Sequence, residues 1–595
     1  MPLPKNSIVL LLAAAVIALP FAFRRDRVAS DWKTGDPILV AISPHNEAIR
    51  SEFETAFSAW HREHYGHPVK IDWRSIGGTT EIMRYLEAEF MAAFRAWRLA
   101  NDKPWTSGAD RLTLDRRFNP ASPPPDATAA WELQRDLHGD FRGTDDPLAF
   151  GAGIDLFFGG GAYDHAIAAG QGLTVPPWAP ENRPEALFTT PAGTELLPRQ
   201  LGGETWRTDT FFGTALSTFG ICSNPDRLRD LGITNTPVAW SDLADPRYAG
   251  QIGIADPTKS GSIAKAFEMI IHEQCLRAVE RAGFTPQDCT AHEARIQAAK
   301  LPPGIMPPEV PDTYQQAVEQ GWEAGLRLVQ EISANARYFT DSAGKVPVDV
   351  STGDAAAGIA IDFFGRYQAE STRSPGGEPR MRYVTPIGGS SASADPISLL
   401  RGAPHRELAV RFIVFTLSPE GQRLWTYRAG TPGGPRKFSL RRLPVRRDFY
   451  PDPEHAEQDA VHREHLRSSS DPLDDPSVNP YALAERFTYY PRWTGAHFNM
   501  HRDLIRTMGM DAGDELKTAW KAIHREPDPA RRARAIALLV RLPDQPEPLT
   551  WKSALSMPGK HKRLDLMREW TLFYRRSYRE ALQSLDTPVP GPDAR

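Results

Sequence analysis

The stretch QIGIADPTKSGSIAKAFEMIIHE, from Gln251 to Glu273, contains a complete strand-to-helix unit. A short apolar run ends at Ala255, and the turn signal Asp256-Pro257 follows it. A small polar cluster then leads into apolar residues at helical spacing. Units of this kind, repeated along a chain, predict an α/β fold with a largely parallel sheet.

The same order of elements is found elsewhere in the chain. PILVAI (37–42) ends at Ser43 and precedes a sequence with apolar residues at helical spacing. GIDLFFGGG (153–161) reads as a buried strand that ends in three glycines before the helical AYDHAIAAG. The α/β pattern therefore extends over most of the first 440 residues.

The junctions between these strands and helices are rich in Gly, Ser and Thr. Ligands of parallel α/β sheets lie at the carboxyl ends of the strands, where helix N-termini offer unpaired N–H groups to anions. One such junction alone is better explained as a helix cap, because Ser and Thr are common N-caps. Several together favour a shared binding cleft. They are Ser43-Pro44-His45, Gly77-Gly78-Thr79-Thr80, Gly159-Gly160-Gly161, Thr258 to Ser262, and Thr352-Gly353-Asp354.

The Lys259-Ser260 pair resembles part of a nucleotide-binding phosphate loop, but the spacing does not fit. Counting from Gly253, the second required glycine falls on Thr258. No dinucleotide fingerprint, HExxH zinc motif or Gly-x-Ser-x-Gly elbow occurs, and no nucleophile–base pair can be assigned. We therefore expect a binding protein with no catalytic residues, cofactor or metal site.

Charge and the N-terminal sequence bear on partners and location. The formal net charge of −4 gives no basic footprint for nucleic acid. The apolar run from Ile8 to Phe23 predicts an export signal over residues 1–27, with the rest of the protein in the periplasm or otherwise outside the cytoplasmic membrane. An uncleaved anchor formed by residues 8–23 stays open, because Arg24 and Arg25 follow without a clean cleavage site.

Two longer stretches carry a resemblance to a known family. They are WSDLADPRYAGQIGIADPTKSGS (240–262) and RGAPHRELAVRFIVFTLSPEGQRLW (401–425). Together with the first strand and helix they resemble the periplasmic (type 2) solute-binding proteins of ABC importers, in particular the branch that includes ferric-ion binders. The resemblance covers roughly Asp36 to Gly430, apart from an insertion at about 100–146.

This resemblance implies two α/β lobes joined by hinge strands. Lobe one would comprise residues 28–220 and 385–440, with the Pro-rich insertion as a surface loop, and lobe two residues 221–384. Residues 441–595 would form a mostly helical extension without a motif, which packs on lobe one or contacts a partner. The resemblance also implies a small-molecule solute and a membrane permease as partners, and we expect a monomer.

The chain departs from the ferric members at two positions. Their histidine after the first strand is matched by His45, but their acidic ligand falls on Gly160 and their tyrosine pair on Phe363-Phe364. Fe(III) requires anionic oxygen ligands, which neither Gly nor Phe supplies. We therefore expect a small polar, anionic solute. A ferric chelate, a ligand-sensing or partner-binding role, and an extracytoplasmic enzyme on the same scaffold are the alternatives.

The expected binding residues come from both lobes. Phosphate, phosphonate, sulfonate or carboxylate would meet the two helix starts, with Lys259 close by. His45 would form a hydrogen bond, Asp362 would hold a hydroxyl or amine, and Phe363 or Phe364 would pack on the solute. The full set is Ser43, His45, Gly78, Thr79, Thr80, Gly160, Thr258, Ser260, Gly261, Ser262, Asp362 and Phe363.

The chain has only three cysteines. Cys275 and Cys289 flank a short segment, and an oxidising compartment would permit a disulfide between them. Spacing alone does not decide this, because a bridge depends on the geometry of the two Cβ atoms. Cys222 lies in a strand-like run and is expected to be a buried small hydrophobe.

Overall fold

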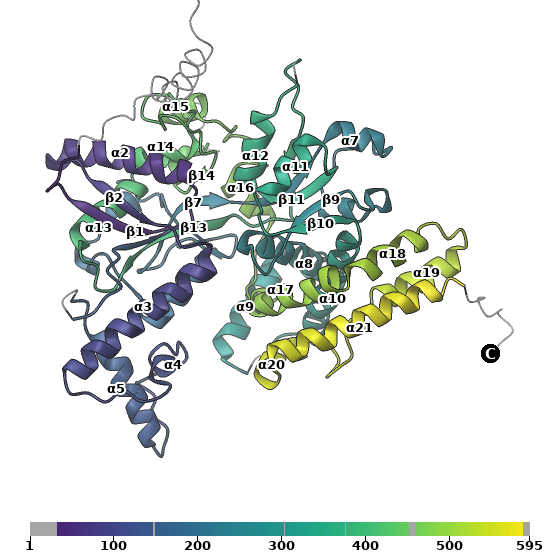
Figure 1. The fold of residues 1–595 in the computed structure, drawn as a ribbon, viewed down its shortest axis with the longest axis horizontal. Helices are drawn as coiled ribbons and strands as arrows, with labels where there is room; N and C mark the ends of the chain where they lie inside the picture. Colours follow the sequence, from purple (N-terminus) through teal and green to yellow (C-terminus); the bar gives the residue numbers. More distant parts are fainter. Residues whose placement is uncertain (1–31, 147–148, 303, 375, 452–459, 587–595) are drawn as a thin grey trace, which may run out of the picture.

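Two β-sheets, each covered by helices, form the two halves of this computed structural model (Figure 1). The structure describes residues 32–146, 149–302, 304–374, 376–451 and 460–586. The predicted export signal over 1–27 and the alternative anchor over 8–23 lie outside these residues. Among the described helices, none combines the length and the apolar character that a membrane span requires.

The first sheet defines lobe one. Its strands lie in the order β14-β7-β13-β3-β1-β2, with β4 paired to β13. β1, β2 and β3 are parallel, whereas β13 runs antiparallel to β3, β4 and β7. The strands are β1 (Ile38–Ile42), β2 (Lys70–Arg74), β3 (Leu156–Phe158), β4 (Thr174–Val175), β7 (Phe212–Ser217), β13 (Ser393–Leu400) and β14 (Leu443–Pro444). Its helices include α2 (Glu47–Tyr65), α3 (Thr79–Ala100), α6 (Ala162–Gln171), α13 (Arg406–Leu417) and α14 (Pro419–Thr426).

The second sheet defines lobe two, with the order β10-β9-β11-β8-β12. Its strands are β8 (Phe219–Ser223), β9 (Ile252–Ala255), β10 (Ala336–Thr340), β11 (Ala357–Ile361) and β12 (Arg382–Val384). Its helices include α7 (Pro225–Asp230), α8 (Gly261–Arg281), α9 (Pro286–Ala299), α10 (Asp312–Ala334), α11 (Lys345–Thr352) and α12 (Asp362–Ser371). The strand β9 and the helix α8 are the unit Gln251–Glu273 from which the α/β prediction started.

Up to β13, the chain passes between the lobes in two short segments. β7 of lobe one ends at Ser217 and β8 of lobe two begins at Phe219, so Thr218 alone separates them. The return path runs from β12 to β13 through residues 385–392. The predicted α/β fold with two lobes is confirmed. Phe219 and Gly220 pair in the second sheet, and β14 pairs with β7 beyond the predicted end of lobe one at residue 440.

The insertion at about 100–146 lies on lobe one and contains helices α4 (Ala109–Thr113) and α5 (Ala129–Gly143). Leu137 and Phe141 of α5 are fully buried against α3 and belong to its apolar core. The buried Arg98 of α3 pairs with Asp136 and Asp140 of α5. The Pro-rich sequence before α5 concealed this helical structure, although the apolar residues of α5 recur every four positions, as in a helix.

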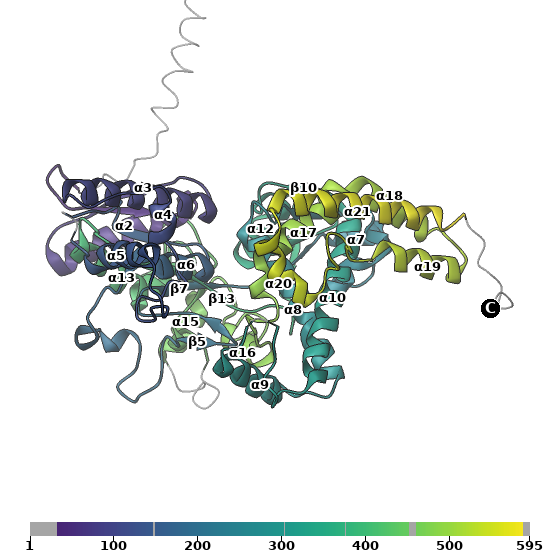
Figure 2. The ribbon, with the colours of Figure 1, turned by 90° about the horizontal axis from the view of Figure 1, so that it is seen from below.

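The C-terminal extension packs mostly on lobe two, which differs from the expected contact with lobe one. α15 (Ala460–Ser468) and α16 (Pro480–Arg486) still lie on lobe one. The later helices join the apolar core of lobe two, where Trp493, Trp520 and Tyr574 are buried in the same cluster as Trp322 (Figures 1 and 2). They are α17 (Phe498–Arg506), α18 (Gly513–Ile523), α19 (Pro529–Leu539), α20 (Trp551–Lys560) and α21 (Arg563–Gln583).

All three cysteines are free and buried. Cys275 donates to the carbonyl oxygen of Val318 at 3.6 Å, and the bridge to Cys289 that the sequence permitted is not formed. Burial raises the pKa of Cys289 to about 11 and those of the other two thiols further, so none is a reactive thiolate at neutral pH. Cys222 lies in β8 as a buried small hydrophobe, as expected.

Candidate functional site

Buried polar residues gather where the two lobes meet, beginning at the end of β1. Ser43 Oγ accepts a hydrogen bond from the backbone N–H of His45 at 3.1 Å, which shapes the turn after the strand. The ring of His45 packs edge-on against Phe158, with 4.7 Å between ring centroids. Its Nε2 lies 3.2 Å from Oδ2 of Asp395 on β13. Ser43 and His45 therefore lie on the buried face of lobe one, beside a carboxylate.

Asp395 also forms an ion pair with Arg442. The guanidinium Nη1 lies 2.5 Å from Oδ2 of Asp395, and Nη2 donates to Oγ of Ser217 at 2.8 Å. Burial alone would raise the pKa of Asp395, but Arg442 and His45 together lower it to about 2. Asp395 is therefore charged at neutral pH. We call the three residues His45, Asp395 and Arg442 the interlobe cluster.

The interlobe cluster touches lobe two through Phe363. The guanidinium carbon of Arg442 lies 4.6 Å from the centre of the Phe363 ring and 5.4 Å from that of Trp425. Trp425 belongs to lobe one, whereas Phe363 is the second residue of α12 in lobe two. A cation held over an aromatic face in a buried setting gains up to about 2 kcal/mol. The contact between Arg442 and Phe363 therefore joins the lobes.

Asp362 links α12 to the hinge. Its Oδ2 accepts hydrogen bonds from the N–H of Thr218 at 3.1 Å and from the Thr218 hydroxyl at 3.3 Å. Its Oδ1 accepts from the N–H of Phe363 at 2.8 Å. Burial raises the pKa of Asp362, although Arg366 and Arg442 oppose this effect. Both oxygens already have partners, so Asp362 positions α12 at the hinge in this conformation.

The interlobe cluster retains polar atoms without hydrogen bonds to the described residues. These buried atoms are Nδ1 of His45, Oδ1 of Asp395 and Nε of Arg442. Leaving a buried polar atom unpaired costs about 1–3 kcal/mol. A polar solute that carries both hydrogen-bond acceptors and donors could supply partners for these three atoms.

The glycines after β3 bring the expected lobe-one residues together. Gly159 packs so closely on His45 that a Cβ atom would lie 2.6 Å from the ring, and a Cβ on Gly160 would lie 2.4 Å from Cγ2 of Thr79. Thr79 begins α3, with Gly78 as its N-cap, and Thr80 is exposed. His45, Gly160 and Thr79 therefore lie side by side, while Thr80 faces solvent.

The expected lobe-two residues are largely engaged in local hydrogen bonds. Thr258 donates from its N–H and its hydroxyl to Oδ1 of Asp256, at 2.8 and 2.6 Å. Ser260 Oγ caps α8 by accepting from the N–H of Ile263 at 3.3 Å. Lys259 is exposed, and its Nζ lies 2.7 Å from Oδ2 of Asp341. Its side chain therefore forms a surface ion pair. Gly261 is exposed with open space at its Cα, and Ser262 is half-buried.

Sequence reasoning missed several residues near this loop and in the interlobe cluster. Arg502 and Arg506 of α17 lie against the Asp256–Thr258 loop. Arg442 and these two arginines lie beyond the stretch that resembles the family, so no motif marked them. Asp395 lies within that stretch, and its signal was an acidic residue inside an otherwise apolar strand.

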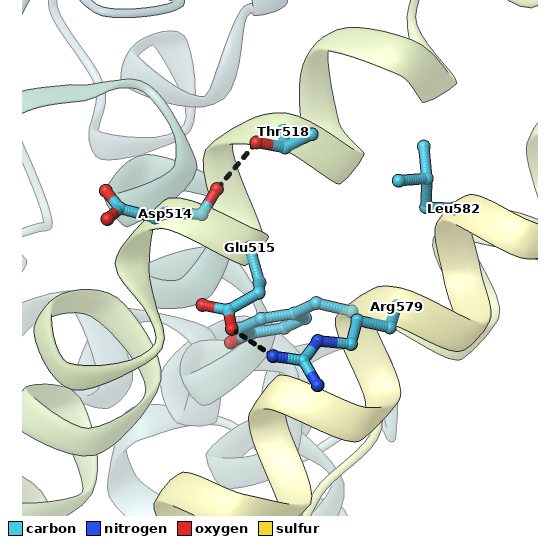
Figure 3. Close-up of a pocket in the computed structure, with 6 residues that line it drawn as sticks. Asp514, Glu515, Thr518, Arg579 and Leu582 are labelled. Atoms are coloured by element: carbon cyan, nitrogen blue, oxygen red, sulfur yellow. Dashed lines mark hydrogen bonds and ion pairs between the residues drawn. The ribbon is translucent and has the colours of Figure 1, made fainter.

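The described residues contain no group of three or more His, Cys, Asp or Glu side chains that could hold a metal ion. Two surface cavities lie in the extension, away from the interlobe cluster. One, of about 190 Å³, lies between α18 and α21, where Glu515 and Arg579 pair at 2.8 Å (Figure 3). The other, of about 450 Å³, is lined by Asp511 and residues of α21. Neither contains residues expected to bind the solute.

Comparison with known proteins gives a match over just over half of the chain. The family described as "Bacterial extracellular solute-binding protein" matches residues 148–449. An uncharacterised protein of Haemophilus influenzae is 26% identical over 272 residues, which is 45% of this chain and 60% of that protein. This chain thus spans 60% of the length of that relative.

Solved structures with a similar chain path include two periplasmic proteins with different ligands. AfuA from Actinobacillus pleuropneumoniae, with fructose-6-phosphate bound, is 16% identical with a TM-score of 0.40, covering 76% of this chain and 95% of AfuA. Iron-bound HitA from Pseudomonas aeruginosa is 13% identical with a TM-score of 0.42, covering 80% of this chain and 100% of HitA.

Proposed function

The chain belongs to the bacterial extracellular solute-binding proteins, and on this premise we propose that it captures a small polar, anionic solute between its two lobes. The resemblance to the solute-binding components of ABC importers that the sequence showed is confirmed. The proposal adds the chemical class of the solute, the place where it binds, and delivery to a membrane permease by the closed form.

The observation that carries the proposal is the interlobe cluster. Arg442 contacts both lobes and has a buried Nε without a partner, and the Nδ1 of His45 is likewise buried and unpaired among the described residues. Hydrogen bonds from a guanidinium to an anion contribute about 1.5–3 kcal/mol each. Oδ1 of Asp395 could accept from a hydroxyl or amine of the same solute. A solute with an anionic end and a hydroxyl or amine end would pair all three atoms.

The N-termini of α3 and α8, one in each lobe, support the anionic character of the solute. Thr79 begins α3 in lobe one, and Gly261 and Ser262 begin α8 in lobe two. Each N-terminus offers unpaired N–H groups and a positive partial charge. A bare ferric ion fits poorly, because Gly160 and Phe363 supply no oxygen ligand and both carboxylate oxygens of Asp362 already accept hydrogen bonds.

The family, the net charge and the link between the two sheets bear on where and how the protein acts. The family places the protein outside the cytoplasm, where we propose that it acts as a monomer in the periplasm. The near-neutral formal charge of −4 supports a role that does not involve nucleic acid. The single-residue link at Thr218 between the sheets supports hinge closure around the solute.

A thermal-shift screen followed by calorimetry tests this proposal. The panel contains inorganic phosphate, sugar phosphates, phosphonates, sulfonates, dicarboxylates and ferric citrate. We expect an organic anion to raise the Tm in proportion to the logarithm of its concentration above Kd. Arg442→Gln and Thr79→Ala should each weaken binding of that anion at least tenfold, which is about 1.4 kcal/mol.

Arg446→Gln is the matched control, because Arg446 is equally buried in lobe one but pairs with Asp448, outside the cluster. It should leave the affinity unchanged. A screen in which only ferric citrate binds would replace the anion proposal with chelate binding. Wild-type affinity in both Arg442→Gln and Thr79→Ala would show that the site lies elsewhere, and chemical turnover of the bound anion would contradict a purely binding role.

A further inference from the structure

The C-terminal extension forms a third connection between the lobes. After α16, Tyr489 donates its N–H to the carbonyl oxygen of Gly202, at 2.8 Å, in the hairpin of β5 (Gln200–Leu201) and β6 (Glu204–Thr205). The hydroxyl of the same tyrosine donates to Oε1 of Glu268 on α8 at 2.7 Å. Tyr489 therefore contacts a hairpin beside lobe one with its backbone and lobe two with its side chain.

A buried ionic group surrounds this connection. Nζ of Lys265 on α8 lies 3.1 Å from Glu204 of the hairpin and 3.1 Å from Glu268 of α8. It also lies 3.7 Å from the centre of the Tyr489 ring. Ser391, in the return segment between the lobes, donates to Glu204 at 2.6 Å. The extension is thus held at the hinge by charges drawn from both sides.

Beyond this point, α17 is anchored firmly to lobe two. Arg502 donates from Nε to the carbonyl oxygen of Pro257 at 2.8 Å and from Nη2 to that of Thr258 at 2.7 Å. Arg506 pairs with Asp256 at 3.0 Å. Met500, Leu504 and Ile505 of the same helix are buried in the lobe-two core. α17 therefore moves with the Asp256–Thr258 loop.

The same helix also contacts lobe one. Asn499 Nδ2 donates to the hydroxyl of Tyr163 on α6 at 3.3 Å, and the Phe498 and Tyr163 rings lie 5.5 Å apart. Asp164 of α6 is close enough to Arg502 for their charges to attract, and it accepts a hydrogen bond from Thr79. In Figure 1, α17 lies on the side of lobe two that faces lobe one.

We propose that α17 is a clasp between the lobes, held to lobe one by the contacts of Asn499 and Phe498 with Tyr163, with Arg502 as a positioning residue that holds the Asp256–Thr258 loop and attracts the Asp164 carboxylate. The inference rests on the proposed function in one respect, namely that the lobes move apart to admit and release a solute. Arg502 acts through the loop and through Asp164. The extension then limits how far the lobes open, and it slows release of the solute.

Spin-label distances measured without solute test the clasp. Labels are attached at Glu407→Cys in lobe one and Arg229→Cys in lobe two, whose side chains are 91% and 76% exposed. The native thiols are buried and stay unlabelled. The double variant Tyr163→Phe/Asp164→Asn removes the hydrogen bond from Asn499 and the charge that attracts Arg502, and it leaves the anchoring of α17 to lobe two intact. We expect the population of longer interlobe distances to rise at least twofold.

Arg502→Gln should shift the distances in the same direction, and Arg506→Gln is its matched control. Arg506 lies one turn along α17 and pairs with Asp256 of lobe two and Asp511 of the extension. Unchanged distances in the Tyr163→Phe/Asp164→Asn variant would overturn the clasp, as would an equal shift in Arg506→Gln. Circular dichroism confirms that each variant is folded.

The outcome is separate from that of the solute proposal, because no solute is present in this measurement. Once an anion has been identified, stopped-flow dissociation adds a second readout. The Tyr163→Phe/Asp164→Asn variant should release the anion about tenfold faster than the wild type. Loss of affinity in Arg502→Gln with unchanged interlobe distances would instead make Arg502 a solute contact and contradict the clasp.

Discussion

Gly160 illustrates how one residue in this protein serves both chemistry and packing. At this position the ferric-binding relatives suggested by the sequence carry an acid, so the glycine first indicated a missing iron ligand. The structure adds a steric reason, since φ is +105° and a Cβ would lie 2.4 Å from Cγ2 of Thr79. L-residues pay about 1–2 kcal/mol in this left-handed region. Gly160 therefore keeps Thr79 and the turn after β3 in contact.

Gly160→Ala should lower the free energy of unfolding by about 2 kcal/mol, because it adds backbone strain and crowds Thr79. The measurement is urea denaturation followed by tryptophan fluorescence. Gly161→Ala is the matched control, since Gly161 has an ordinary φ of −102° and the nearest atom to a new Cβ is Asp164 Oδ2 at 3.6 Å. It should change stability by less than about 0.5 kcal/mol. Equal losses in the two variants would refute this account.

At the scale of elements, α8 and α10 of lobe two pack closely along their lengths. A Cβ on Gly321 of α10 would lie 2.4 Å from Cα of Cys275, and a Cβ on Gly325 would lie 2.6 Å from Cα of Ile271. The two glycines are four residues apart and so lie on one face of α10. Their lack of side chains lets the helix backbones approach closely. Helix propensity alone would disfavour both positions.

Gly325→Ala should destabilise lobe two by about 1–3 kcal/mol, because the new methyl group meets backbone that cannot move aside. Gly139→Ala in α5 should do the opposite and stabilise the protein by about 0.5–1 kcal/mol, since nothing lies within 4 Å of its Cβ position. Thermal unfolding of both variants measures the difference. If Gly325→Ala were as stable as the wild type, the packing of α8 on α10 would have to be looser than described.

At the scale of the whole molecule, the extension from α17 onward is a structural part of lobe two. Gln330 of α10 donates from Nε2 to the carbonyl oxygen of Leu539 at 2.7 Å and to the hydroxyl of Tyr578 at 2.8 Å. Trp520 donates to Oδ1 of Asn335 at 2.8 Å, and Trp322 donates to His501 at 2.8 Å. These buried hydrogen bonds join helices from the two ends of the sequence into one core.

Native-state hydrogen exchange should therefore show α17, α18 and α21 opening together with α8 and α10. Backbone amides in one cooperative unit share the same opening free energy and the same dependence on denaturant. Mass spectrometry of peptides from α21 and α10 over a series of urea concentrations gives this comparison. Exchange in α21 through a separate opening of much lower free energy would show that the extension is an independent module.

The proposed binding region was only partly predictable from the sequence. The junctions after β1 and β3 were placed correctly at the end of the lobe-one sheet, and His45, Gly160 and Thr79 do lie together. Whether they bind solute stays a prediction. Arg442 and Asp395 could not be paired from the sequence, because they are far apart along the chain and only the path of the extension brings them together.

What the sequence determined by itself was the order of strands and helices, the two-lobe fold and the membership of the family. Those features depend on local periodicity and on motifs that persist over short stretches. Only the tertiary structure decided which charges meet between the lobes, why glycines occupy their positions, and that the extension docks on lobe two. These features depend on contacts between residues far apart along the chain, and such contacts follow from how helices and sheets pack together rather than from any local pattern.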